Sequence, residues 1–187
     1  MTDQELNNLK YPVGKFTAPE VFTSPQIGQW IDTIAQFPLK ITNLTKDLSQ
    51  EELNWKYRPE GWTIKQVVHH CGDSHINSLV RFKLALTEEV PDIRPYHEDR
   101  WAQLNDSLDD DISDALGLLT HLHAKWHKLL RSLNPEELKR KYRHPEHGRI
   151  FTLEETIGIY AWHCEHHEAH IKQALANKGK FNATDVT

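Results

Sequence analysis

The chain has 187 residues, 38% of them hydrophobic and 26% charged, which is typical of one soluble globular domain. Its formal net charge of −5 and the lack of a Lys/Arg-rich stripe disfavour nucleic-acid binding, because phosphate contacts need a basic surface. No segment approaches the roughly 18 uncharged apolar residues that cross a membrane, and the acidic N-terminus does not resemble a secretory signal, so we expect a cytoplasmic protein without membrane partners.

The N-terminal part of the chain predicts an arm followed by an interrupted helix. Residues 1–23 show little periodicity and contain two prolines, so an extended arm is expected there. Ser24 followed by Pro25 is typical of a helix start. The apolar pattern then continues as far as Leu48, and Pro38 is expected to interrupt it.

Three further long helices have clearer signals. Two of them open with capping boxes, Thr63 with Gln66 and Thr152 with Glu155. The expected ranges are about 63–88, 111–132 and 152–177, with short helical segments in the linkers and no strand-like alternation of comparable length. The whole chain, 1–187, is therefore expected to form a single all-α domain, an antiparallel four-helix bundle.

The last helix carries the densest group of histidines in a chain that contains thirteen of them. His163, His167 and His170 share one edge of its apolar stripe, and His166 lies further round. Side chains four residues apart on a helix lie one above the other, so His163 and His167 can bind one cation together. Since imidazole is the commonest metal ligand, this pair predicts half of a metal site.

A polar row on the helix expected at 63–88 supplies the other half. His70, Ser74, Asn77 and Arg81 follow one another at spacings of four, three and four residues and border the apolar stripe. Such a row is what the wall of a buried site would look like. His70 is the best candidate for a third ligand by its direction, and bundles commonly build metal sites from facing helices.

The other histidines and the two cysteines are interpreted as structural residues. Six other histidines are interpreted as core or boundary residues: His75, His121, His123, His127, His144 and His147. For the histidines grouped above, a structural polar network is the alternative to a metal site. Cys71 and Cys164 form neither a CxxC motif nor a disulfide framework and are interpreted as small core residues. The segment from His163 to His167 matches neither HExxH nor HxxEH, so a zinc protease is not expected.

Taken together, these segments resemble the DinB-like superfamily, and within it the YfiT-like group described as metal-dependent hydrolases and bacillithiol transferases. The resemblance covers roughly residues 10–178. The matching segments are Gly61-Trp62-Thr63, Gln66-Val67-Val68-His69-His70, Asp73-Ser74-His75, Asn77-Ser78, Arg81-Phe82-Lys83-Leu84, Leu86-Thr87-Glu88-Glu89, Ile93-Arg94-Pro95-Tyr96, Tyr160-Ala161-Trp162-His163, His166-His167 and His170-Ile171.

The resemblance implies a four-helix bundle with a histidine triad, and its positions correspond to His70, His163 and His167. It implies an open coordination position, where a low-molecular-weight thiol binds as thiolate and attacks an electrophilic small molecule. Hydrolysis of a small ester or amide by metal-activated water uses the same triad. A non-enzymatic metal-binding dimerisation module is a further alternative, and a homodimer is the expected assembly for this family.

The expected cofactor is one divalent ion, with zinc first and nickel or another ion as alternatives. The expected helpers are five residues beside the triad: Asp73, Asn77, Arg81, His166 and His170. Of these, Asp73, His166 and His170 are expected to fix the tautomers of the ligands. Arg81 or Asn77 is expected to hold an anionic part of the thiol. The cysteines beside two ligands, Cys71 and Cys164, raise the question of redox sensitivity.

Overall fold

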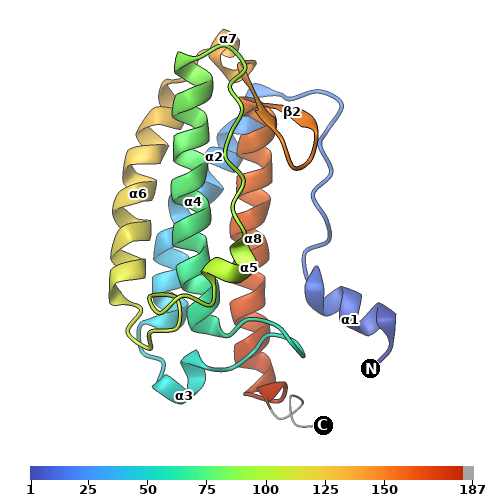
Figure 1. The fold of residues 1–187 in the computed structure, drawn as a ribbon, viewed down its shortest axis with the longest axis vertical. Helices are drawn as coiled ribbons and strands as arrows, with labels where there is room; N and C mark the ends of the chain where they lie inside the picture. Colours follow the sequence, from blue (N-terminus) through green and yellow to red (C-terminus); the bar gives the residue numbers. More distant parts are fainter. Residues whose placement is uncertain (183–187) are drawn as a thin grey trace.

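The computed structural model describes residues 1–182, in which long helices pack lengthwise around one hydrophobic core (Figure 1). The elements in chain order are α1 (Asp3–Lys10), α2 (Ser24–Thr45), α3 (Gln50–Leu53), α4 (Ile64–Thr87), α5 (Glu98–Trp101), α6 (Ser113–Ser132), α7 (Pro135–Leu138), β1 (Lys141–His144), β2 (Arg149–Thr152) and α8 (Leu153–Asn177). The helices α2, α4, α6 and α8 form a four-helix bundle, which confirms the predicted all-α bundle; two of its neighbouring pairs, α2 with α8 and α4 with α6, are parallel instead of antiparallel.

The order of the helices around the bundle differs from their order along the chain. Helix α2 packs against α6 and α8, and α4 also packs against α6 and α8, so the consecutive helices α2 and α4 are diagonal. The colours in Figure 1 show α2 and α8 running in one direction and α4 and α6 in the other. The neighbours α4 and α8 are therefore antiparallel, which brings the two histidine-bearing faces together.

Helix α2 continues through Pro38, where an interruption was expected. Proline has no N–H and cannot donate to the carbonyl four residues earlier, which here belongs to Ile34. That carbonyl instead accepts a hydrogen bond from Nδ1 of His123 on α6, at 2.7 Å. The helix therefore tolerates the proline because a neighbouring helix supplies the missing donor.

The N-terminal arm is extended only in part, which corrects the expectation for residues 1–23. Thr2 and Glu5 form a capping box, in which the backbone N–H of Thr2 donates to the Glu5 carboxylate at 2.7 Å. Helix α1 follows, and Pro12 comes directly after its C-cap at Tyr11. The capping signal was present in the sequence, but the segment buries no residue and so has no apolar periodicity.

A small hairpin precedes α8 and was not predicted. Strands β1 and β2 pair antiparallel, with Tyr142 opposite Phe151. Gly148 in the connecting turn has a φ of +58°, a backbone conformation that glycine adopts without strain. Each strand has four residues, which is too short for alternation to stand out from its surroundings.

The core of the bundle is rich in aromatic side chains. Trp126 on α6 is fully buried and packs edge-on against Phe82 and Tyr160.

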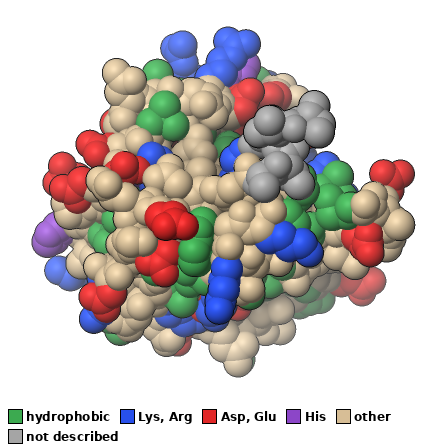
Figure 2. Space-filling model, turned by 90° about the horizontal axis from the view of Figure 1, so that it is seen from below, with side chains coloured by type: hydrophobic (Ala, Val, Ile, Leu, Met, Phe, Trp, Pro, Cys, Tyr) green, Lys and Arg blue, Asp and Glu red, His purple; other side chains and the backbone are tan. Residues whose placement is uncertain are grey.

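Acidic and basic side chains are interspersed over the end of the bundle seen in Figure 2, in keeping with the modest net charge. Within residues 1–182, no helix combines the length and apolar character that a membrane crossing demands.

Candidate metal centre

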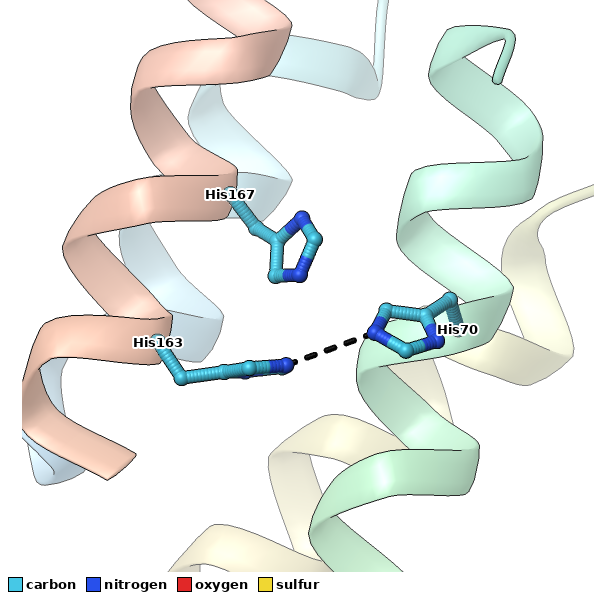
Figure 3. A group of neighbouring side chains, drawn as sticks. All are labelled: His70, His163 and His167. Atoms are coloured by element: carbon cyan, nitrogen blue, oxygen red, sulfur yellow. Dashed lines mark hydrogen bonds between the residues drawn. The ribbon is translucent and has the colours of Figure 1, made fainter. Parts of the chain in front are cut away.

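Three histidines from two helices converge between α4 and α8 (Figure 3). His70 lies in the second turn of α4, whose start is fixed by the capping box of Thr63 and Gln66. His163 and His167 lie one turn apart on α8. Because the two helices are antiparallel neighbours, all three imidazole rings point into the same space, so the structure brings together the three residues that the sequence grouped.

The spacing of the nitrogen atoms fits a divalent ion. Nε2 of His70 lies 3.3 Å from Nε2 of His163, and one nitrogen from each of the three rings lies within 4.8 Å of the others. Two nitrogens that are each about 2.0–2.1 Å from a tetrahedral zinc ion are about 3.3 Å apart. The first pair therefore already has the spacing of two ligands, and an all-imidazole donor set suits zinc, nickel or copper.

Burial keeps the three imidazoles in the neutral form that binds metals. Burial lowers the pKa of His70 to about 4, with a smaller effect from His166. Burial also lowers the pKa of His163 and of His167 well below the usual value, and neighbouring histidines add to the effect. At neutral pH each ring therefore has one nitrogen with a free lone pair.

The hydrogen-bond partner of Nδ1 of His163 is His75, which the sequence predicted only as a core residue. Nε2 of His75 lies 3.0 Å from Nδ1 of His163, and Nδ1 of His75 lies 2.7 Å from Nε2 of His123. The interpretation of His75 and His123 as buried core histidines is correct, but their link to the site was missed. A signal existed, since a histidine inside an apolar stripe needs a polar partner.

Two of the expected helpers on α4, Asp73 and Asn77, form no hydrogen bond to the three histidines among the described contacts. Burial together with Asp106 raises the pKa of the Asp73 carboxyl to about 6. The side-chain amide of Asn77 donates to the backbone carbonyl of Asp73, at 2.8 Å. The hydrogen bond of Asn77 thus holds its side-chain amide to the backbone of its own helix.

His166 and His170 lie beside the three histidines. The ring of His166 stacks on Trp162, with centroids 4.5 Å apart. The ring of His170 stacks on Tyr57 at 3.8 Å, and its Nε2 lies 3.2 Å from the backbone carbonyl of Lys10. Among the described contacts, neither forms a hydrogen bond to the three histidines, so both are placed to shape the surroundings of the site.

Two adjoining cavities open at the site, and His163 lines both of them. The first has a volume of about 510 Å³ and is also lined by Ser74, Arg81 and Tyr160. Nη1 of Arg81 donates to the hydroxyl of Tyr160 at 3.4 Å, and no carboxylate pairs with this guanidinium within residues 1–182. Arg81 therefore offers a guanidinium without an ion-pair partner, in a cavity whose wall also carries the carboxylates of Glu98, Asp99 and Glu146.

The second cavity has a volume of about 670 Å³ and contains all three histidines of the site in its wall. Aromatic, basic and acidic side chains complete it, among them Trp62, Trp162, Arg58 and Glu98, together with Lys10 and Tyr11 from the N-terminal arm. Both volumes fall in the range of small-molecule sites.

The two cysteines are buried and do not face the site. Both are free thiols, with exposed fractions of 0% for Cys71 and 1% for Cys164. Burial raises the pKa of each thiol well above the usual value. Since the thiolate is the reactive form, both side chains have the character of inert core residues, as the sequence analysis interpreted them.

The model of the DinB superfamily matches residues 28–171, a span that contains α4, α6, most of α2 and α8, and the three histidines. The chain belongs to the DinB superfamily. The protein named "Putative metal-dependent hydrolase YfiT" from Bacillus subtilis is 44% identical over 172 residues, which cover 92% of this chain and 97% of YfiT. A similarly named protein from Bacillus cereus strain 03BB102 is 49% identical over 167 residues, 89% of this chain and 95% of that protein.

Solved structures of the superfamily agree with this membership. The structure of Bacillus subtilis YfiT, described as a four-helix bundle with an unusual topology, superimposes with a TM-score of 0.89 and covers 92% of this chain and 98% of YfiT. A mycothiol-dependent maleylpyruvate isomerase gives a TM-score of 0.61 at 15% identity, over 78% of this chain and 60% of the isomerase. The second likeness concerns the fold alone.

Proposed function

We propose that this DinB protein is a metal-dependent enzyme whose His70, His163 and His167 hold one divalent ion, with zinc as the first choice. We further propose that it transfers a low-molecular-weight thiol to an electrophilic small molecule. The observation that carries the proposal is the convergence of three imidazoles where two cavities adjoin. Three protein ligands are typical of catalytic zinc sites, whereas structural sites use four.

The side chains around the site would have different roles in such a reaction. A divalent ion at the three histidines supplies Lewis acidity, which lowers the pKa of a thiol or water that it coordinates. Arg81 is placed to pair with an anionic group of a reactant in the first cavity. Trp62 and Trp162 in the second cavity offer apolar surface that excludes water from a bound electrophile.

The pair of cavities favours transfer over hydrolysis. A transferase must hold a thiol and an electrophile at the same time, and each cavity is large enough for one small molecule. The DinB fold also serves an enzyme described as mycothiol-dependent, which supports thiol use in this fold. A metal-binding dimerisation module without activity has no use for two cavities beside the ligands.

Metal-dependent hydrolysis of a small ester or amide is the second candidate. It is favoured by the names of the relatives at 44% and 49% identity. The same three histidines serve both reactions, and they differ only in the nucleophile that the ion activates. The need for an added thiol therefore distinguishes the two.

The test is a turnover assay on protein with quantified zinc. A panel of electrophiles is incubated with and without cysteine, glutathione or bacillithiol, and the products are identified by mass spectrometry. We expect turnover only with a thiol, a product that contains the thiol sulfur, and loss of activity and bound zinc in His163→Ala. The matched control His121→Ala changes an exposed histidine of α6 and retains both.

Two outcomes contradict the proposal in different ways. Turnover that does not depend on thiol identifies a hydrolase. Zinc content and activity that survive the triple change of His70, His163 and His167 to alanine exclude the site itself. The expected homodimer and cytoplasmic location are further proposals, which sedimentation and cell fractionation test.

A further inference from the structure

A line of three hydrogen-bonded imidazoles runs from the backbone of α2 through the core to the proposed metal site. Nδ1 of His123 lies 2.7 Å from the carbonyl oxygen of Ile34, and Nε2 of His123 lies 2.7 Å from Nδ1 of His75. Nε2 of His75 lies 3.0 Å from Nδ1 of His163, whose own Nε2 faces His70. Three helices, α2, α6 and α4, thus contribute to the surroundings of one side chain of α8.

The carbonyl of Ile34 determines the direction of every hydrogen bond in this line. A carbonyl oxygen only accepts, so Nδ1 of His123 must carry the proton. A neutral imidazole has one N–H, which leaves Nε2 of His123 as an acceptor and makes Nδ1 of His75 the donor. The same reasoning gives Nε2 of His75 as the acceptor and Nδ1 of His163 as the donor. Nε2 of His163 is then left with its lone pair.

These hydrogen-bond directions require neutral imidazole rings, and the surroundings of His75 and His123 keep both rings uncharged. His75 and His123 are 0% and 1% exposed, and no carboxylate is hydrogen-bonded to either ring among the described residues. A buried charge without a partner is costly, so these imidazoles stay uncharged. Burial accordingly lowers the pKa of His123 to about 4.

The start of the line is a consequence of Pro38. In an uninterrupted helix, the carbonyl of Ile34 would accept from the N–H of residue 38, but proline has none. The proline therefore leaves a buried acceptor, and His123 fills this position. Phe37 packs on both rings, with centroids 5.4 Å from His75 and 5.7 Å from His123, and so restricts their orientation.

The geometry points to His75 and His123 as positioning residues that hold His163 with its proton on Nδ1 and its lone pair on Nε2. They act through His163 and contact neither substrate nor metal. Outer hydrogen bonds of this kind fix the tautomer and orientation of a ligand histidine, and their loss typically costs about 10–100-fold in metal affinity. The other ligand on α8 differs, because Nδ1 of His167 is buried without a hydrogen-bond partner in the described chain.

The first test reads the protons directly in the unchanged protein. Long-range ¹H–¹⁵N NMR correlations of the metal-free protein distinguish Nδ1–H from Nε2–H imidazoles. We expect His123, His75 and His163 all to carry the proton on Nδ1. A His163 with its proton on Nε2 overturns the inference, and this measurement needs no variant to fold.

The second test measures zinc affinity by competition with a chromophoric chelator. We expect His75→Phe, which keeps a ring but removes both nitrogens, to bind zinc about 10–100-fold more weakly. His75→Gln offers an amide oxygen to Nδ1 of His163 and should lose less. The matched control is His121→Phe, which alters an exposed histidine on the same helix as His123 and should leave the affinity unchanged.

Unchanged zinc affinity in a folded His75→Phe overturns the inference. The inference rests on the proposed metal site, but the two can fail separately. If the unchanged protein binds no zinc, the proposed function fails, while the NMR measurement still decides whether the three imidazoles have the assigned protons.

Discussion

Arg81 is the side chain in the first cavity best suited to select an anionic reactant. Its guanidinium donates a hydrogen bond to the Tyr160 hydroxyl and forms no ion pair among the described side chains, although Glu98, Asp99 and Glu146 also line this cavity. A hydrogen bond to a charged group contributes about 1.5–3 kcal/mol. We expect Arg81→Leu to raise the KM for an anionic thiol by about 10–150-fold, with zinc content unchanged.

Steady-state kinetics with matched charged and uncharged thiols measures this effect. Lys83→Leu is the control, since it removes an exposed positive charge from the same helix. An equal KM in Arg81→Leu and the unchanged protein would show that the guanidinium does not contact the reactant.

The buried histidines give the metal-free protein a defined pH dependence. His123 has a pKa of about 4 in the fold and an ordinary value near 6.5, so the folded state binds fewer protons than the unfolded state in between. Stability is therefore complete above about pH 6.5 and decreases as the pH falls toward 4. The loss from this one group is about 3 kcal/mol, at 1.36 kcal/mol per pKa unit.

Urea unfolding of the metal-free protein at several pH values between 7 and 4 measures the loss. His123→Gln removes this titrating group and should flatten the curve in part, because His70, with a pKa also lowered to about 4, contributes separately. A free energy of unfolding that stays constant from pH 7 to 4.5 would contradict the burial argument.

At the scale of elements, the N-terminal arm acts as a cover for the second cavity. Backbone carbonyls of the arm accept hydrogen bonds from α8: Gln173 donates to Leu9 at 3.1 Å and Trp162 to Gly14 at 3.0 Å. Helix α1 itself contributes no fully buried residue, so the bundle does not depend on it. The arm therefore affects access to the site more than it affects the fold.

Deletion of residues 1–14 tests this role. The deletion removes three hydrogen bonds between the arm and α8, including the one between His170 and Lys10. Each costs about 0.5–1.5 kcal/mol, so we expect the free energy of unfolding to decrease by about 1.5–4.5 kcal/mol. We expect zinc to dissociate several-fold faster into excess chelator, because Lys10 and Tyr11 no longer close the second cavity. Trp162→Phe, which removes a single bond to the arm, is the milder comparison, and an unchanged dissociation rate in the deletion would contradict the covering role.

Much of the bundle could be predicted from local signals in the sequence. The capping box at Thr63 and the spacing of His163 and His167 each depend on residues within one turn of a helix. At Thr152 only half of the expected capping box forms, because the Glu155 carboxylate pairs with Arg149. The links between His75, His123 and the backbone of α2 could not be predicted in this way. Periodicity shows which face of a helix is buried, but not which helix lies opposite, and the diagonal position of α2 and α4 is a tertiary property.

At the scale of the whole molecule, metal binding should stabilise the fold, because the ligands come together only when α4 and α8 are packed. At free zinc of 100 times Kd, binding contributes about 2.7 kcal/mol. For a chain of this size, we expect Tm to rise by about 5–11 °C, as measured by calorimetry with and without zinc. The triple alanine variant of His70, His163 and His167 should show no such rise, and an equal rise would place the zinc elsewhere.

The diagonal arrangement of α2 and α4 also bears on the order of events when the chain folds. His70 on α4 and His163 on α8 are 93 positions apart in the sequence, and the whole of α6 lies between these two helices along the chain. The high sequence separation makes this contact slow and entropically costly to form. A nascent or unfolded chain would therefore compete poorly for scarce cellular zinc. Zinc would bind only after the bundle has assembled, so a zinc-loaded chain is a fully folded one.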